Sequence, residues 1–188
     1  MKLMVLDGNS IVNRAYYGVG KARLLTTRQG LHTNAIYGFV TMLQKLLDQE
    51  KPDAVCAAFD RREPTFRHKA DAAYKANRKG MPEELAEQML PLKQVLDAMS
   101  VPCYELSGYE ADDLIGTISR KCEAAGWDCT IATGDRDSLQ LITAHTHVRL
   151  LTGGKGPDSD RCMTESTFSM GSAVPRRTGG RSAFVRRK

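Results

Sequence analysis

The sequence predicts an α/β domain with a mostly parallel central sheet and helices on both faces of that sheet. Two observations support this fold class. Short apolar runs typical of buried strands alternate with segments whose apolar residues recur every three or four positions. This alternation continues without internal repeats up to residue 153. A repeated strand, helix, strand order favours a parallel sheet, because parallel neighbours need a long crossover that a helix usually supplies.

The first half of the chain is expected to hold two strands and two helices. Residues 3–6 form a short apolar strand, and a loop leads from it to a helix whose apolar face lies within residues 36–47. A second strand spans residues 54–59. Pro82 and the two acids after it predict the start of another helix, since proline suits the first turn and acids complement the helix dipole. Pro91 is expected to kink that helix.

The second half is expected to hold three strands and one helix. Residues 101–106 form a short strand, and the apolar positions within residues 114–122 mark a helix that Gly126 can end. Residues 129–133 and 148–151 supply two more strands.

The net charge of +5 belongs to the C-terminal end of the chain. Residues 153–188 carry eight Lys and Arg against three acids, whereas residues 1–152 carry equal numbers of each sign. The same end is rich in Gly, Ser, Thr and Arg and shows no apolar periodicity, which is typical of loop or disorder. We therefore expect a folded domain over residues 1–152 and a basic tail over residues 153–188 that is disordered or non-native.

The composition does not suggest a membrane or secreted protein. No apolar run approaches the roughly 20 residues of a spanning helix, and the apolar N-terminus meets Asp7 too early for a signal peptide. The five cysteines include no CxxC spacing, so neither a zinc site nor a disulfide framework is indicated. We expect a cytoplasmic protein.

Acidic residues gather where the predicted strands end. They follow three strands and begin one helix, and the seven are Asp7, Asp60, Glu110, Asp112, Asp113, Asp135 and Asp137. Ligands of open parallel sheets bind outside the carboxyl ends of the strands, so we expect these acids to converge there. Each acid alone is equally well explained as a turn or cap residue. If that were the explanation for all of them, acids should occur at both ends of the strands, whereas they follow the strands at one end only. Crowded carboxylates need a cation, and oxygen ligands favour Mg²⁺ or Mn²⁺ over zinc.

A carboxylate metal site of this kind suits phosphodiester hydrolysis, in which two ions about 4 Å apart activate water and stabilise the leaving oxygen. The basic stretch over residues 61–80 supplies a matching surface, with seven Lys and Arg against two acids. On a helix, one stripe at spacings of three and four would hold Arg67, Asp71, Tyr74, Lys75 and Arg78. Basic groups that track phosphates beside an aromatic ring are typical of single-strand binding, although a solvated helix face is the ordinary alternative.

Five segments together resemble a known family. They are LDGNSIVNRAYYG, TNAIYGFVTML, AAFDRREPTFRHKADAAYKANRKGMPEEL, GYEADDLIGTI and TGDRDSLQL. In this order they resemble the N-terminal 5′ nuclease domains of bacterial DNA polymerases of the polymerase I type. Those domains belong to the flap endonuclease family and have a PIN-like, Rossmann-like fold. The resemblance covers residues 1–152.

The resemblance implies a role for each part of the site. The seven acids would be the metal ligands of a two-ion Mg²⁺ or Mn²⁺ site, and residues 61–79 a helical arch that passes a 5′ single strand. Lys75 and Arg78 would be catalytic, stabilising developing charge, while Tyr74 would stack on DNA. The implied nucleic-acid contacts are Arg14, Arg61, Arg62, Arg67, Lys69, Tyr74, Lys75, Arg78 and Lys79. The implied partners are DNA with a 5′ flap or end and RNA–DNA primer junctions, bound by a monomer at the bacterial nucleoid.

Two features of the family are missing from this sequence. A further acidic segment that adds ligands to the second ion is not found, nor is the helix and hairpin module that grips the duplex. We therefore expect a truncated product with an impaired second ion site. Whether residues 153–188 are native or read in a shifted frame stays open. Two functions stay open: a divalent-metal-dependent 5′-3′ exonuclease and flap endonuclease of replication and repair, or a non-catalytic fragment that binds nucleic acid. A PIN-like ribonuclease is a remoter alternative, since it would not require the segment YKANRKG.

Overall fold

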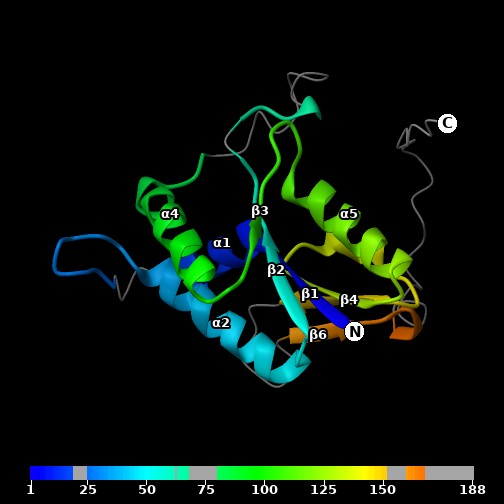
Figure 1. Ribbon diagram of the computed structural model, residues 1–188. Helices are drawn as coiled ribbons and strands as arrows, with labels where there is room; N and C mark the ends of the chain where they lie inside the picture. Colours follow the sequence, from blue (N-terminus) through cyan, green and yellow to red (C-terminus); the bar gives the residue numbers. More distant parts are fainter. Residues whose placement is uncertain (19–24, 62, 68–79, 152–159, 168–188) are drawn as a thin grey trace.

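The computed structural model describes residues 1–18, 25–61, 63–67, 80–151 and 160–167. Its centre is a six-stranded sheet in the order β3-β2-β1-β4-β5-β6 (Figure 1). The strands are β1 (Lys2–Asp7), β2 (Ala54–Ala58), β3 (Cys103–Tyr104), β4 (Asp128–Thr133), β5 (Thr146–Leu151) and β6 (Asp160–Met163). All neighbours are parallel except β5 and β6. The predicted fold class, a mostly parallel sheet in an α/β domain, is confirmed.

Helices cover both faces of the sheet because β1 is apolar on both sides. Met4 and Leu6 pack toward α1 (Gly8–Gly18), α2 (Asn34–Glu50) and α4 (Glu83–Ala98). Val5 points the other way, into the cluster formed with α5 (Ala111–Ala124). Figure 1 shows α5 on one side of the strands and the other three helices on the opposite side. No helix among the described residues is long and apolar enough to cross a membrane.

The order of the strands creates a crevice between β1 and β4. From β1 the chain passes through α1 and α2 to β2, and then through α4 to the edge strand β3. It returns across the other face through α5 to β4, which pairs with the free side of β1. The direction of winding therefore reverses between β1 and β4, and such a switch point leaves an open crevice at the carboxyl ends of the two strands.

Three elements differ from the sequence prediction. The expected loop after the first strand is the helix α1, which buries Ile11, Val12 and Ala15 against the sheet. The third strand is shorter than the predicted 101–106, because it pairs at the sheet edge with only the last two residues of β2. In addition, β6 lies within the predicted unstructured tail, so the sheet extends beyond the boundary set at residue 152.

Several sequence predictions fall outside the described residues. They concern the arch over residues 68–79, Arg62, and the tail over residues 153–159 and 168–188. Pro91 lies inside α4, which continues from Glu83 to Ala98 as one helix.

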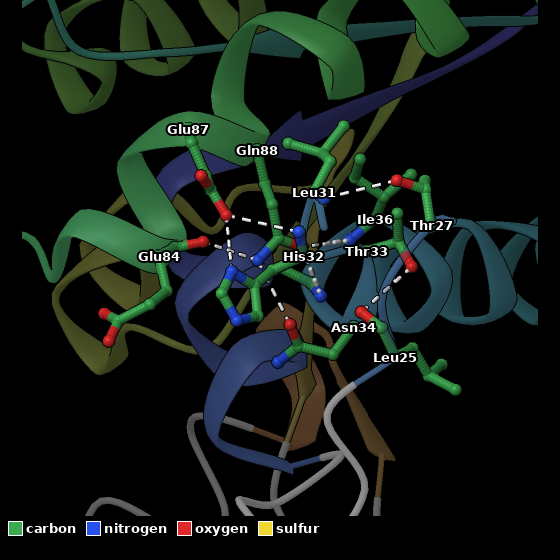
Figure 2. Close-up of polar contacts among 11 residues, drawn as sticks. Leu25, Thr27, Leu31, His32, Thr33, Asn34, Ile36, Glu84, Glu87 and Gln88 are labelled. Atoms are coloured by element: carbon green, nitrogen blue, oxygen red, sulfur yellow. Dashed lines mark hydrogen bonds and ion pairs between the residues drawn. The ribbon is translucent and has the colours of Figure 1, made fainter. Parts of the chain in front are cut away.

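The beginning of α2 is held by a side chain from α4. Thr33 precedes the helix but makes no side-chain cap. Instead, Oε1 of the fully buried Gln88 accepts the backbone N–H of Ala35 at 2.8 Å, and its amide nitrogen donates to Asn34 Oδ1 at 3.1 Å (Figure 2). One position earlier on α4, Glu87 meets Nδ1 of His32 at 2.5 Å. These contacts fix α4 against α2.

Candidate metal centre

A polar cleft of about 310 Å³ opens at the carboxyl ends of β1, β2 and β4. Six of the seven predicted metal ligands line it. The lining residues are Asp7, Asn9, Ser10, Asn13, Asp60, Glu110, Ala111, Asp112, Asp135 and Asp137. The acids thus come from three strand ends and from the start of α5, as the sequence order suggested.

Asp7, at the end of β1, is the most deeply placed carboxylate of the cleft. It is 5% exposed, and each of its oxygens accepts one hydrogen bond, Oδ1 from the backbone N–H of Ser10 and Oδ2 from the hydroxyl of Thr133. The Thr133 oxygen in turn accepts the backbone N–H of Asp135 at 2.9 Å. One buried hydroxyl therefore sets the positions of acids that follow two neighbouring strands.

Asp60 connects three elements around the cleft. Its Oδ2 accepts the side-chain amide of Asn9 at 2.7 Å, and its backbone N–H donates back to Asn9 Oδ1 at 3.3 Å. Its Oδ1 accepts the backbone N–H of Ala111 at 2.6 Å. An acceptor at the first turn of α5 suits the positive end of the helix dipole, so Asp60 also anchors that helix.

The seventh predicted ligand, Asp113, is not part of the cleft lining. Its two oxygens face the guanidinium of Arg67 at 2.7 and 2.8 Å, and Oδ2 also accepts the backbone N–H of Glu110. Arg67 additionally donates to Glu110 Oε2 at 3.3 Å. This arginine, expected to contact nucleic acid, thus ties the segment after β2 to the start of α5.

The acids that line the cleft disturb each other's ionisation. Burial, together with the charges of Asp7, Asp135, Asp60 and Glu110, raises the pKa of Asp112 to about 6. Burial, together with the charges of Asp60 and Asp135, also raises the pKa of Asp7 in spite of its two hydrogen bonds. A bound cation would relieve both effects, so this all-oxygen set fits a divalent ion such as Mg²⁺.

The described residues do not form a closed ligand cage. Among them, no three Asp, Glu, His or Cys side chains are arranged to ligate one ion as they stand. Mg²⁺ does not require such a cage, because it keeps several of its waters and binds through one or two carboxylates. The cleft volume leaves room for those waters.

The other predicted contacts divide into two groups. Arg61 is exposed and pairs with Glu63 at 3.4 Å, while Arg14 lies on α1 against Gly134, with its Nε buried and without a hydrogen-bond partner in the described part of the chain. The remaining predicted contacts lie outside the described residues, namely Arg62, Lys69, Tyr74, Lys75, Arg78 and Lys79.

Sequence reasoning missed the side chains that hold the acids in place. Asn9 and Ser10 stand two and three positions after Asp7, and Thr133 stands two positions before Asp135. A polar residue beside a strand-end acid was the available signal, but its partner lies far away in the sequence and only the fold reveals it.

The fold and cleft define a class of α/β domains that gather carboxylates at the switch point of a parallel sheet. Within this class, the chain belongs to the family of 5′-3′ exonuclease N-terminal, resolvase-like domains, whose model matches residues 2–170. This match continues past residue 152, where the sequence alone suggested a domain boundary.

The relatives in sequence are bacterial DNA polymerases I. The chain is 45% identical over 152 residues to the enzyme of Caldicellulosiruptor bescii, and the aligned region covers 81% of this chain and 18% of that polymerase. It is 42% identical over 159 residues to the enzyme of Synechocystis, and the aligned region covers 84% of this chain and 16% of that polymerase. The chain therefore spans less than a fifth of the length of these polymerases.

Solved structures share the fold. The flap endonuclease of bacteriophage T5, in a complex with DNA and metal ions, aligns with a TM-score of 0.64 at 18% identity, over 87% of this chain and 58% of its own. Human GEN1 in complex with Holliday junction DNA aligns with a TM-score of 0.51 at 14% identity, over 90% of this chain and 39% of its own.

Proposed function

We propose that this domain is a divalent-metal-dependent 5′-3′ exonuclease and 5′ flap endonuclease acting on DNA and on RNA–DNA primer junctions. The observation that carries the proposal is the convergence of six acids from three strand ends and one helix start on a single cleft. Family membership and the relatives support the nuclease class. The T5 flap endonuclease, which shares the fold, was solved with DNA and metal ions.

Asp7, Asp60, Glu110, Asp112, Asp135 and Asp137 are the residues that would hold Mg²⁺ or Mn²⁺. When bound, such ions supply Lewis acidity to a phosphodiester and lower the pKa of water. The protein's own contribution is to orient these acids. Thr133 and Ser10 fix Asp7, while Asn9 fixes Asp60. Lys75 and Arg78 are proposed to stabilise charge that develops on the phosphate.

The test uses a 5′-labelled DNA flap with Mg²⁺ or Mn²⁺ and the Asp135→Asn variant. Asparagine keeps the side-chain oxygen that accepts the backbone N–H of Asp137, so the local turn is preserved while the charge is lost. Asp128→Asn is the matched control, because Asp128 begins the same strand at its opposite end and is exposed.

Cleavage by the wild type and by the control, and a loss of about 100-fold or more in Asp135→Asn, would support the proposal. Cleavage that persists in Asp135→Asn, or that needs no divalent ion, would contradict it. Binding of the flap without cleavage, by a wild type shown to be folded by circular dichroism, would favour the non-catalytic alternative.

A further inference from the structure

Two aromatic side chains form an exposed pair beside the metal centre. The rings of Phe66 and Tyr109 have centroids 5.7 Å apart and are tilted by 58°. Phe66 is 49% exposed and Tyr109 is 47% exposed. The pair therefore presents about half of its apolar surface to solvent, although nearby apolar residues of β2 and α5 are buried.

The backbone holds these two rings in place. The N–H of Phe66 donates to the carbonyl of Gly108 at 2.9 Å, and the hydroxyl of Ser107 bonds to the carboxylate of Glu63. Gly108 has φ +84°, a left-handed conformation that glycine adopts without strain. The segment after β2 and the loop before α5, which rise together in Figure 1, are thus tied to each other. These contacts hold the two rings next to each other.

The pair lies next to Glu110, one of the residues that line the cleft. Tyr109 directly precedes Glu110, which lines the cleft, and consecutive Cα atoms are about 3.8 Å apart. Phe66 directly precedes Arg67, whose guanidinium binds Glu110. The guanidinium carbon also lies 4.6 Å from the centroid of the Phe66 ring. The ring pair therefore adjoins an arginine that already pairs with Asp113 and Glu110 at the edge of the acidic site.

A partner for this ring pair must present a flat face to the two exposed rings. An unpaired nucleic-acid base does so, because it can stack on an aromatic ring. Building on the function proposed above, we propose that Phe66 and Tyr109 form a stacking surface for one unpaired base of the nucleic-acid strand that enters the metal centre. Stacking at this point would fix the distance between that base and the phosphate at the acids.

The test compares Tyr109→Leu with the wild type in binding a fluorescein-labelled 5′ flap. Ca²⁺ replaces Mg²⁺ so that binding is measured without cleavage, and a series of flaps carries a single abasic site at successive positions. Tyr104→Leu is the matched control, since Tyr104 is 48% exposed but lies on the edge strand β3. Tyr109→Phe retains the ring, and thermal melting checks that every variant is folded.

Tyr109→Leu should raise the Kd for the normal flap about tenfold, whereas Tyr109→Phe and Tyr104→Leu should stay close to the wild type. With the abasic site at one particular position, the Kd of the wild type should rise by the same factor. The Kd of Tyr109→Leu should not rise any further at that position. Equal Kd values for Tyr109→Leu and the wild type would overturn the inference alone, as would an equal loss at every abasic position. A wild type that neither binds nor cleaves the flap would overturn the proposed function as well.

Discussion

The hydroxyl of Thr133 donates a 2.6 Å hydrogen bond to Oδ2 of Asp7, although the two residues are 126 positions apart in the chain. Both are buried, at the ends of the adjacent strands β4 and β1. The pKa of Asp7 is raised even though this bond favours the charged carboxylate. Losing the bond would therefore raise the pKa further. The bond is therefore important both for the fold and for the ionisation of the cleft.

Replacing Thr133 by Val should test that importance. Valine keeps the shape but removes the donor to Asp7 and the acceptor of the Asp135 N–H, so we expect a loss of about 1–3 kcal/mol in the free energy of unfolding. Affinity for Mn²⁺, measured by calorimetry, should fall about 10-fold to 100-fold. Thr133→Ser retains the hydroxyl and should restore most of the affinity. A Val variant with unchanged Mn²⁺ affinity would mean that Thr133 does not orient the acids.

Gly8 is required by close packing at the start of α1. A Cβ atom there would overlap the ring of Phe59, which is fully buried and stacks on Phe39. Gly8→Ala should therefore lower the free energy of unfolding by about 1–3 kcal/mol in urea denaturation. Gly116→Ala is the control. Gly116 lies in the interior of α5, and a Cβ atom there would make only ordinary contact with Leu141. That change should instead stabilise by about 0.5–1 kcal/mol. Equal effects at both positions would rule out the packing explanation.

The sequence predicted the parts of the fold that depend on local patterns. The sequence predicts β1 and β4 because both are short apolar runs typical of buried strands. The helix α1 was missed because Gly8 and Asn9 favour a turn and only a few of the following residues are apolar. Its helical conformation depends on packing against the sheet, which a local pattern does not contain.

The candidate site was likewise predictable in outline. Strand-end acids reach the same edge in any parallel sheet, and six of the seven line the cleft. The seventh illustrates the limit. Asp112 and Asp113 are consecutive in a helix, so their side chains point about 100° apart, and only Asp112 faces the cleft. Asp113 faces Arg67, which lies 46 positions earlier in the chain, and spacing alone does not predict that partner.

Gln88 should contribute more to stability than the ion pair one position before it on α4. Gln88→Leu leaves the N–H of Ala35 and the oxygen of Asn34 without their partners in a buried region, so we expect a loss of about 1–3 kcal/mol. Glu87→Gln removes the charge from the contact with His32 but keeps a side-chain oxygen that can accept the same hydrogen bonds. This pair is also partly exposed to solvent, so the melting temperature should stay close to that of the wild type. Differential scanning calorimetry of the two variants compares them directly. A larger loss for Glu87→Gln would reverse the ranking and assign the contact between α2 and α4 to the ion pair.

Asp112 should destabilise the metal-free protein at neutral pH. Its pKa is about 6 in the folded protein against an ordinary value of 3.8, so between these values the folded state binds more protons than the unfolded state. Stability must then fall as the pH rises through this window, and the penalty is complete above pH 6. In EDTA at pH 8, Asp112→Asn should melt about 3 °C higher than the wild type, which corresponds to about 1 kcal/mol after allowance for solvent screening. At pH 3.5 the two should melt together.

Asp128→Asn serves as the control of opposite sign, because the hydrogen bond from His145 lowers the pKa of Asp128. A lowered pKa contributes stability above the ordinary value, but this pair is exposed to solvent, so the variant should melt close to the wild type at pH 8 and not above it. Mg²⁺ should then raise the melting temperature of the wild type more than that of Asp112→Asn, because the ion relieves a repulsion that the variant no longer has. If Asp112→Asn melts at or below the wild-type temperature in EDTA at pH 8, crowding of the acids does not destabilise the cleft, and the case for a cation there loses its electrostatic basis.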